Sequence, residues 1–167
     1  MNWFCDEMLG RLARLLRAAG HDTALAAAGT PDHALLAQAR AEGRILLTRD
    51  RRLAETAGAQ GCLLLGQSVE EQARSLAGAF PVDWLHAPFT RCLIDNCPLH
   101  PAPPDRLAEV PAGARGLSVP VGGPSRSGPS GTGPSVTSCP CCGRLYWPGS
   151  HVRRLAGTLR RLAGTGG

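Results

Sequence analysis

The first 80 residues of the chain alternate between short apolar runs and longer stretches with helical periodicity. The apolar runs, which are candidate strands, are residues 2–5, 22–27, 45–48 and 62–65. The helical patterns cover residues 7–19, 31–42, 51–57 and 69–79. Because the segments between the strands are too long for hairpin turns, the strands are expected to lie parallel, with helices on both faces of the sheet. The pattern therefore predicts an α/β fold.

The charge of the chain is unevenly distributed. The net charge is +5 in 167 residues, and all 18 basic residues are Arg, which indicates a compositional bias rather than a function. Residues 1–90 hold nine Arg and ten acidic residues, whereas residues 91–167 hold nine Arg and three acidic residues. The C-terminal half is therefore the basic half, and nucleic acid is more easily attracted there.

The sequence carries no signal for a membrane or for secretion. No stretch approaches the roughly 20 apolar residues of a membrane span, and no basic lead precedes a long apolar run at the N-terminus. A cytoplasmic protein without a membrane partner is expected. In that compartment the seven Cys, five of which follow position 90, favour thiolate ligation of a metal over a disulfide framework.

Three acidic residues follow the first three candidate strands. Asp6 comes directly after the first strand, Asp32 lies in the first turn of the helix after the second, and Asp50 comes after the third. Because parallel strands end at one edge of a sheet, these side chains, called the acid edge below, are expected to gather there. Gathered carboxylates repel one another unless divalent cations neutralise them, and their oxygens suit Mg²⁺ or Mn²⁺. Such an ion activates water against a phosphodiester, so the acid edge is the predicted catalytic site for hydrolysis of a nucleic-acid backbone.

Other interpretations of these acids are structural or belong to other enzyme classes. Asp32 at the start of a helix is favoured by the helix dipole, and Asp50 fits a turn. A phosphate-accepting receiver domain needs a lysine that this chain lacks, and Asp6 is not followed by the Asp-x-Asp pattern of a phosphatase. The glycine-rich dinucleotide motif and the Walker lysine are also absent from the sequence.

Two groups of residues are candidates for contacting nucleic acid. The group beside the acid edge is Arg11, Arg14, Arg17 and Arg49. The group near the C-terminus interleaves cations with aromatic residues and comprises Arg144, Tyr146, Trp147, His151, Arg153 and Arg154. Such surfaces neutralise phosphates and stack bases. The alternatives are that the arginine row is a solvated helix face and that the two aromatic residues pack the C-terminal segment onto the main domain.

Several segments together carry a family resemblance. They are Asp6 to Arg17 (DEMLGRLARLLR), Gly20 to Thr23 (GHDT), Arg44 to Asp50 (RILLTRD), Arg91-Cys92, and residues 139–151 (CPCCGRLYWPGSH). The combination resembles the Mut-seven C-terminal RNase domain family over about residues 2–100 and 138–155. The resemblance implies a PIN-like parallel sheet, a metal-dependent ribonuclease activity and an inserted zinc ribbon. It carries over clearly to Asp6 and Asp50, and less directly to Asp32, because the family usually has two or three consecutive acids there and this chain has His33 next.

The cysteine pattern departs from that of the family. Cys139-x-x-Cys142 followed by glycine fits a zinc knuckle, in which two thiolates bind one tetrahedral ion. The family pairs it with Cys-x-x-Cys-Asn, but here Cys92 is followed by Asp95 and then by Cys97. Either Cys97 binds zinc across the longer gap, or Asp95 supplies an oxygen, or tight zinc binding has been lost. The favoured zinc ligands are Cys92, Cys97, Cys139 and Cys142, with Cys141 as a substitute, while Cys5 and Cys62 are expected in the core.

The sequence thus predicts four regions. They are a PIN-like nuclease domain (1–90), a zinc-ribbon module (91–110 and 138–155), a disordered loop (111–137) and a basic tail (156–167). The loop is assigned on its seven Gly, five Pro and five Ser in 27 residues. The expected function is a metal-dependent ribonuclease with Mg²⁺ or Mn²⁺ for catalysis, Zn²⁺ for structure and RNA as partner. The alternative is a non-catalytic zinc-ribbon RNA-binding protein with a degenerate PIN-like domain.

Overall fold

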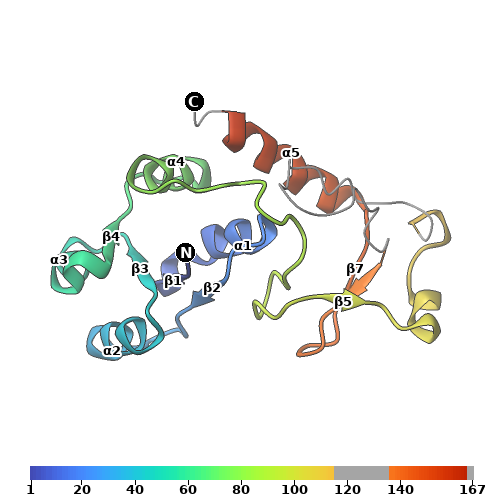
Figure 1. Cartoon of the computed structure of the whole chain (residues 1–167), viewed down its shortest axis with the longest axis horizontal. Helices are drawn as coiled ribbons and strands as arrows, with labels where there is room; N and C mark the ends of the chain where they lie inside the picture. The colour runs from blue at the N-terminus through green and yellow to red at the C-terminus, as the bar shows by residue number, and fades with distance from the viewer. Residues whose placement is uncertain (115–135, 165–167) are drawn as a thin grey trace.

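A sheet of four parallel strands, in the order β2-β1-β3-β4, forms the centre of the fold (Figure 1). The computed structural model describes residues 1–114 and 136–164. The strands are β1 (Trp3–Cys5), β2 (Thr23–Leu25), β3 (Ile45–Thr48) and β4 (Gly61–Leu63). All three strand pairings are parallel, so the predicted α/β fold with a parallel sheet is confirmed.

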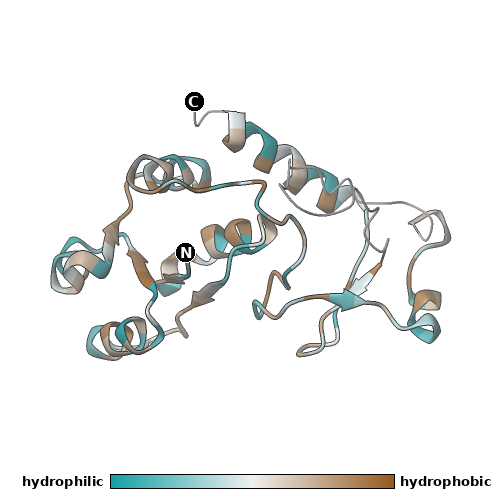
Figure 2. Cartoon of the chain, in the orientation of Figure 1, coloured by the Kyte–Doolittle hydropathy of each residue, from teal (hydrophilic) through white to brown (hydrophobic). Residues whose placement is uncertain are grey.

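Helices connect the strands and cover both faces of the sheet. They are η1 (Glu7–Leu9), α1 (Gly10–Ala18), α2 (Asp32–Glu42), α3 (Arg51–Ala57), η2 (Gly58–Gln60) and α4 (Val69–Ala79). Because successive strand residues face opposite sides, Trp3 and Cys5 pack in the cluster of α1 and α4, whereas Phe4 packs in the cluster of α2 and α3. In Figure 2, β3 is hydrophobic along most of its length, whereas the helices mix hydrophilic and hydrophobic residues.

Successive strands are added on opposite sides of β1: β2 lies on one side, and β3 and β4 lie on the other. From β1 the chain passes to β2 on one side, and it then returns across β1 to β3 and on to β4. In open parallel sheets, ligands bind outside the carboxyl ends of the strands where such a reversal separates the loops. The carboxyl ends of β1 and β3 flank this place.

A second, smaller region follows the sheet. We call residues 91–114 and 136–149 the cysteine module. It contains a three-stranded antiparallel sheet of β5 (His100–Pro101), β6 (Thr137–Ser138) and β7 (Leu145–Tyr146), together with the helices η3 (Pro104–Glu109) and η4 (Ala112–Ala114). In Figure 1 the module lies on the opposite side of the molecule from α2 and α3.

The stretch expected to be a disordered loop is ordered at both ends. Ala114 and Val136 are buried together with Val110 in a small apolar cluster, and Thr137 begins β6. The expectation of disorder is therefore wrong for residues 111–114 and 136–137. These apolar residues bury surface that the average composition of the segment did not indicate. The rest of the predicted loop, residues 115–135, lies outside the described residues.

The predicted basic tail is part of a long helix, α5 (Ser150–Gly164). Leu159 is fully buried and Leu162 is 6% exposed, and both belong to the main core beside α1 and α4. The helix forms despite its glycines because tertiary packing of an apolar face outweighs intrinsic propensity. A boundary at residue 156 is therefore not supported, and residues 165–167 lie outside the described part. None of the helices described is long and apolar enough to cross a membrane.

Candidate functional site

Asp6 stands at the carboxyl end of β1, the strand between β2 and β3. Its side chain is buried, with 9% exposed, and its backbone N–H donates to Leu47 O at 3.0 Å. The hydroxyl of Thr48 donates to Asp6 Oδ2 at 2.8 Å. The carboxylate is therefore fixed in position by β3, and Thr48 is a site residue that the sequence analysis missed. The sequence feature that could have indicated Thr48 is a polar residue at the end of an apolar strand, directly before Arg49-Asp50.

Asp50 is tied to the same hydroxyl group. Its backbone N–H donates to Thr48 Oγ1 at 3.0 Å, so Thr48 connects Asp6 with Asp50. Asp50 Oδ1 accepts from the N–H groups of Arg52 at 2.7 Å and Leu53 at 3.1 Å, and it thereby caps α3. The turn role considered for Asp50 is real, but it occupies one carboxylate oxygen and leaves Asp50 at the acid edge.

Asp32 is the exposed first residue of α2, after the loop that follows β2. Among the described residues, Asp6, Asp32 and Asp50 do not form a group whose ligand atoms all lie within 4.8 Å of one another. Direct contact is not required for Mg²⁺, because this ion keeps several of its waters. Glu7 Oε2 accepts from the N–H of Gly29 at 2.6 Å, which ties η1 to the loop leading to α2. No pattern in the sequence indicated this role for Glu7.

A polar cavity of about 410 Å³ is lined in part by residues close in sequence to Asp6 and Asp50, although none of the three acids lines it. Its lining includes Arg11 and Arg14 of α1 and Arg49, which directly precedes Asp50. All three arginines are exposed, and Arg49 Nη2 donates to Gln67 Oε1 at 3.0 Å. Three of the four arginines expected near the acid edge thus border one cavity that can accommodate an anionic group.

Arg17 does not belong to this surface. It is only 3% exposed, and its guanidinium donates to Thr23 O at 2.8 Å and to the carbonyl oxygens of Leu93 and Ile94. The expectation that Arg17 contacts nucleic acid is therefore wrong, because its donors are used inside the protein. Helical periodicity placed it in a row with Arg11 and Arg14 but carried no information on the segment packed against the end of α1. Its role is to join α1 and β2 to the cysteine module.

Six potential ligands meet in the cysteine module. The ligand atoms of one group all lie within 4.8 Å of one another, and this group is Cys92, Asp95, Cys139 and Cys142. Cys97 forms a disulfide bond with Cys141. The expectation that Cys97 is the fourth zinc ligand therefore does not hold in this structure, because a disulfide sulfur is not a thiolate. The ligand group contains Asp95 in the place expected for Cys97.

The environment of the group favours a charged Asp95. Burial opposes its ionisation, but hydrogen bonds from the thiols of Cys142, Cys92 and Cys139 keep the pKa of Asp95 well below its usual range. Asp95 in turn raises the pKa of Cys142 to about 12. Outside the module, burial raises the pKa of Cys5 to about 12, and Cys5 and Cys62 are both buried in the core, as expected.

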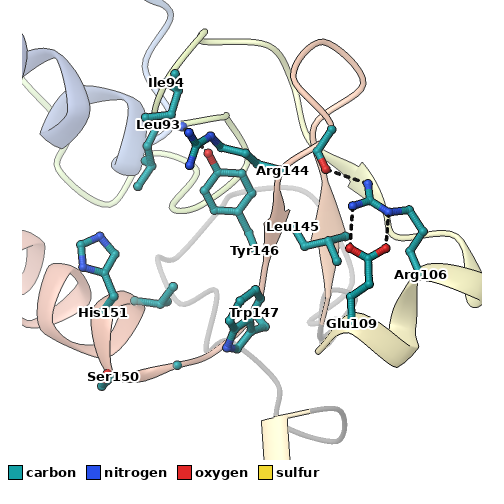
Figure 3. Close-up of a pocket in the computed structure, with 13 residues that line it drawn as sticks. Leu93, Ile94, Arg106, Glu109, Arg144, Leu145, Tyr146, Trp147, Ser150 and His151 are labelled. Carbon is teal, nitrogen blue, oxygen red and sulfur yellow. Dashed lines mark hydrogen bonds and ion pairs between the residues drawn. The ribbon is translucent and has the colours of Figure 1, made fainter. Parts of the chain in front are cut away.

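A larger cavity, of about 620 Å³, opens on the cysteine module. Arg144, Tyr146, Trp147 and His151 line it, and Figure 3 shows their side chains around the same open space. Arg106 and Glu109 also line the cavity; they pair at 2.8 Å, and Arg106 donates to Gly143 O at 2.6 Å. Four of the six residues of the predicted C-terminal group are thus brought together at one cavity.

Arg153 is not among the residues that line this cavity. It is exposed on α5, and its Nη1 donates to Pro148 O at 3.3 Å. Arg154 is likewise an exposed residue of α5 outside the lining.

Comparisons with known proteins show the family of the chain. The model of the Mut7-C RNAse domain matches residues 1–159. The chain is 40% identical over 100 residues to the exonuclease mut-7 homolog of Homo sapiens, and this alignment covers 56% of the chain but only 11% of that relative. No solved structure matches the chain. The family match spans both the parallel sheet and the cysteine module, and the chain belongs to the Mut7-C RNase domain family.

Proposed function

We propose that the chain is a metal-dependent ribonuclease whose catalytic residues are Asp6, Asp32 and Asp50. The observation that carries this proposal is the hydrogen-bonded link from the Asp6 carboxylate through the Thr48 hydroxyl to the N–H of Asp50 at the carboxyl edge of the sheet. Membership in an RNase-domain family supports hydrolysis of a nucleic acid. The relative named as an exonuclease supports the same reaction class.

The donor set of the acid edge fits a hard divalent cation. Its ligands are carboxylate oxygens, which suit Mg²⁺ or Mn²⁺, and Asp6 and Asp50 would hold the ion with help from Asp32. When bound, such an ion polarises the phosphodiester and lowers the pKa of the attacking water. Thr48 keeps the Asp6 carboxylate in a fixed direction, because it donates to Oδ2.

The cavity beside the acid edge is the proposed binding site for the RNA backbone. Arg11, Arg14 and Arg49 are exposed there, and Arg49 is the neighbour of Asp50 in sequence. Guanidinium groups bind phosphates with paired hydrogen bonds, so a strand held by these residues would have a phosphodiester next to the acids. In this role the arginines bind and orient the RNA backbone, and the acid edge cleaves the phosphodiester.

The aromatic cavity of the cysteine module favours a second candidate function, RNA binding without cleavage. Trp147 and Tyr146 offer ring surfaces, and Arg144 and His151 are exposed beside them. Bases stack on aromatic side chains with little regard to sequence. If the acid edge is inactive, this cavity is the proposed RNA-binding site.

The test is cleavage of end-labelled single-stranded RNA by the purified full chain, with Mn²⁺, with Mg²⁺ or without an added divalent ion. We expect metal-dependent cleavage that falls at least about 100-fold in Asp6→Asn and in Asp50→Asn, a loss larger than is typical for residues that only orient a ligand. Asparagine still caps a helix, so Asp50→Asn should keep α3. Asp105→Asn, which alters an exposed acid of η3, is the matched control.

Equal cleavage in both acid variants and the wild type would refute the proposed site. RNA binding that is unchanged in these variants, without cleavage by any of the proteins, would instead establish the second function. Loss of that binding in Trp147→Ala would then locate it at the aromatic cavity.

A further inference from the structure

The two loops that carry the metal-ligand candidates have the same backbone conformation. In the first loop, Cys92 N donates to Cys97 O at 2.8 Å and Asn96 N donates to Cys92 O at 3.1 Å. In the second loop, the corresponding bonds join Cys139 N to Arg144 O and Gly143 N to Cys139 O, both at 2.9 Å. Asn96 and Gly143 also share the left-handed conformation, with φ of 69° and 71°.

This equivalence fixes which residue stands in each ligand position. The first ligand of each loop is a cysteine, Cys92 or Cys139. The second ligand position, three residues later, is Cys142 in one loop and Asp95 in the other. Cys97 lies one residue beyond the left-handed turn of the first loop, so it aligns with Arg144 rather than with a ligand. The loop of Cys92 therefore has the backbone of a zinc knuckle, and it carries the carboxylate of Asp95 where the other loop carries the sulfur of Cys142.

The distances fit a tetrahedral zinc ion. With Zn–S bonds of about 2.3 Å, two ligand sulfurs lie about 3.8 Å apart. The Sγ atoms of Cys92 and Cys142 are 3.7 Å apart. With a Zn–O bond of about 2.1 Å, a sulfur and an oxygen ligand lie about 3.6 Å apart. Cys139 Sγ is 3.2 and 3.4 Å from the two oxygens of Asp95.

Neighbouring groups orient these ligands. The hydroxyl of Tyr146 accepts from Leu93 N at 3.1 Å and lies 3.0 Å from Cys92 Sγ, so its own hydrogen can point to that sulfur. The N–H of Cys97 donates to Asp95 Oδ1 at 3.2 Å. Metal ligands in proteins are commonly held by such outer hydrogen bonds.

The disulfide joins the same two loops beside the ligand group. Cys97 follows the first loop, Cys141 lies inside the second, and their Cα atoms are 6.5 Å apart. A second group of close ligand atoms, Asp95, Cys97, Cys139 and Cys141, shares two members with the first. While Cys97 and Cys141 are bonded to each other, this second group lacks its two extra thiolates, and the first group is the complete one.

We propose that Cys92, Asp95, Cys139 and Cys142 bind one zinc ion, and that the Cys97–Cys141 disulfide is a second clasp between the same loops that does not depend on metal. The carboxylate replaces one thiolate of the usual knuckle pair. The disulfide compensates by restraining the loops, because a cross-link lowers the entropy of the unfolded chain.

The test is zinc content and zinc affinity of the full chain, measured by elemental analysis and by competition with a chromogenic chelator. Wild type and the double variant Cys97→Ser/Cys141→Ser should each hold one zinc per chain. Asp95→Ala should weaken zinc binding more than about tenfold. Intact mass after thiol alkylation in denaturant with a chelator should show two blocked cysteines, Cys97 and Cys141, in the wild type purified without a reducing agent.

Replacing zinc by Co²⁺ reports directly on the type of ligand, without a comparison of binding affinities. The sulfur-to-cobalt absorption band rises with the number of thiolate ligands. Asp95→Cys should therefore give a stronger band and tighter binding than the wild type, while Cys97→Ser/Cys141→Ser should leave the band unchanged. A weaker band in the double variant, or full zinc affinity in Asp95→Ala, would overturn the ligand set. These readouts measure metal binding or the state of the cysteines, so they are independent of the proposed ribonuclease activity.

Discussion

The acid edge and the cysteine module are both organised around one hydroxyl group, but the hydroxyls act in different settings. Thr48 is fully buried at the end of β3 and links Asp6 to Asp50. Tyr146 is half-buried in β7 and lies against the sulfur of Cys92. The first works within a parallel sheet with apolar clusters on both faces. The second packs against the main core from a module whose own apolar cluster contains few residues.

The difference shows two ways of positioning ligands. At the acid edge, main-chain hydrogen bonds of the sheet place Asp6 and Thr48, and the core supports the strands. In the cysteine module, main-chain hydrogen bonds shape each ligand loop, and the disulfide and the proposed zinc ion join the two loops.

Arg17→Met should have the largest effect on stability. It removes donors from Thr23 O, Leu93 O and Ile94 O, and buried acceptors without a donor cost about 1–3 kcal/mol each. We expect the free energy of unfolding in urea to fall by about 3 kcal/mol or more. The control is Arg14→Met, an exposed position of the same helix, where a change within about 0.5 kcal/mol is expected. Equal effects of the two variants would show that Arg17 does not join the two regions.

Thr48→Val should damage the acid edge alone. The variant takes the hydrogen bond from Asp6 and leaves the N–H of Asp50 without its acceptor, so we expect a loss of about 2 kcal/mol in stability. RNA cleavage should fall about 10- to 100-fold, as for other groups that orient metal ligands. Zinc affinity should stay unchanged. Thr48→Ser keeps the hydroxyl and should retain most of the cleavage; a cleavage rate in Thr48→Val equal to that of wild type would remove Thr48 from the site.

Tyr146→Phe is the corresponding change in the cysteine module. It deletes the hydroxyl beside Cys92 Sγ while keeping the ring, and we expect zinc affinity to fall about tenfold. Competition with a chromogenic chelator measures this affinity. Cleavage at the acid edge should not change, since Tyr146 belongs to the other region. An effect on cleavage with no effect on zinc would reverse the assignment.

Asp22→Asn should have a small effect that depends on pH. Asp22 Oδ1 accepts from Arg44 at 2.6 Å and from Asn96 of the cysteine module at 2.8 Å. Burial opposes its ionisation, but these bonds dominate and lower its pKa. The ionised carboxylate therefore stabilises the fold above the unfolded pKa of about 4, and this contribution is lost as pH falls through the lower folded value.

Urea denaturation of Asp22→Asn and wild type should differ by about 1 kcal/mol at pH 7. The difference should shrink below about pH 4, where the wild-type carboxyl also becomes neutral. Glu42→Gln removes the other acid beside Arg44 without touching the cysteine module, and it is the control. A difference that grows as the pH falls would contradict the assigned pKa direction.

The sequence predicted the parts of the molecule that follow from local periodicity and parallel topology. The four strands and α1 to α4 appear where apolar runs and helical patterns indicated them, and α3 spans residues 51–57 as expected. Asp6 and Asp50 could be placed because Asp6 directly follows a strand and Asp50 lies two residues after the end of another. The proposed role of Asp32 stays a prediction, since α2 begins only after a loop.

Tertiary contacts between distant segments could not be predicted in this way. Arg17 has the same spacing as its exposed neighbours, and only the packing of Leu93 and Ile94 against α1 buries it. For the zinc ligands, spacing rules admit both Cys97 and Asp95. The choice depends on the backbone of the loop, where the turn at Asn96 comes before Cys97.

Burial of Ala114 with Val136 has a practical consequence for protein engineering. The chain leaves the cysteine module and re-enters it at neighbouring points, so the segment between them closes a loop whose ends are already held together. The entropy of closing such a loop grows only with the logarithm of its length, about 0.6 kcal/mol for each doubling. An affinity tag or a fluorescent reporter inserted between residues 115 and 135 should therefore leave both ligand sets in place.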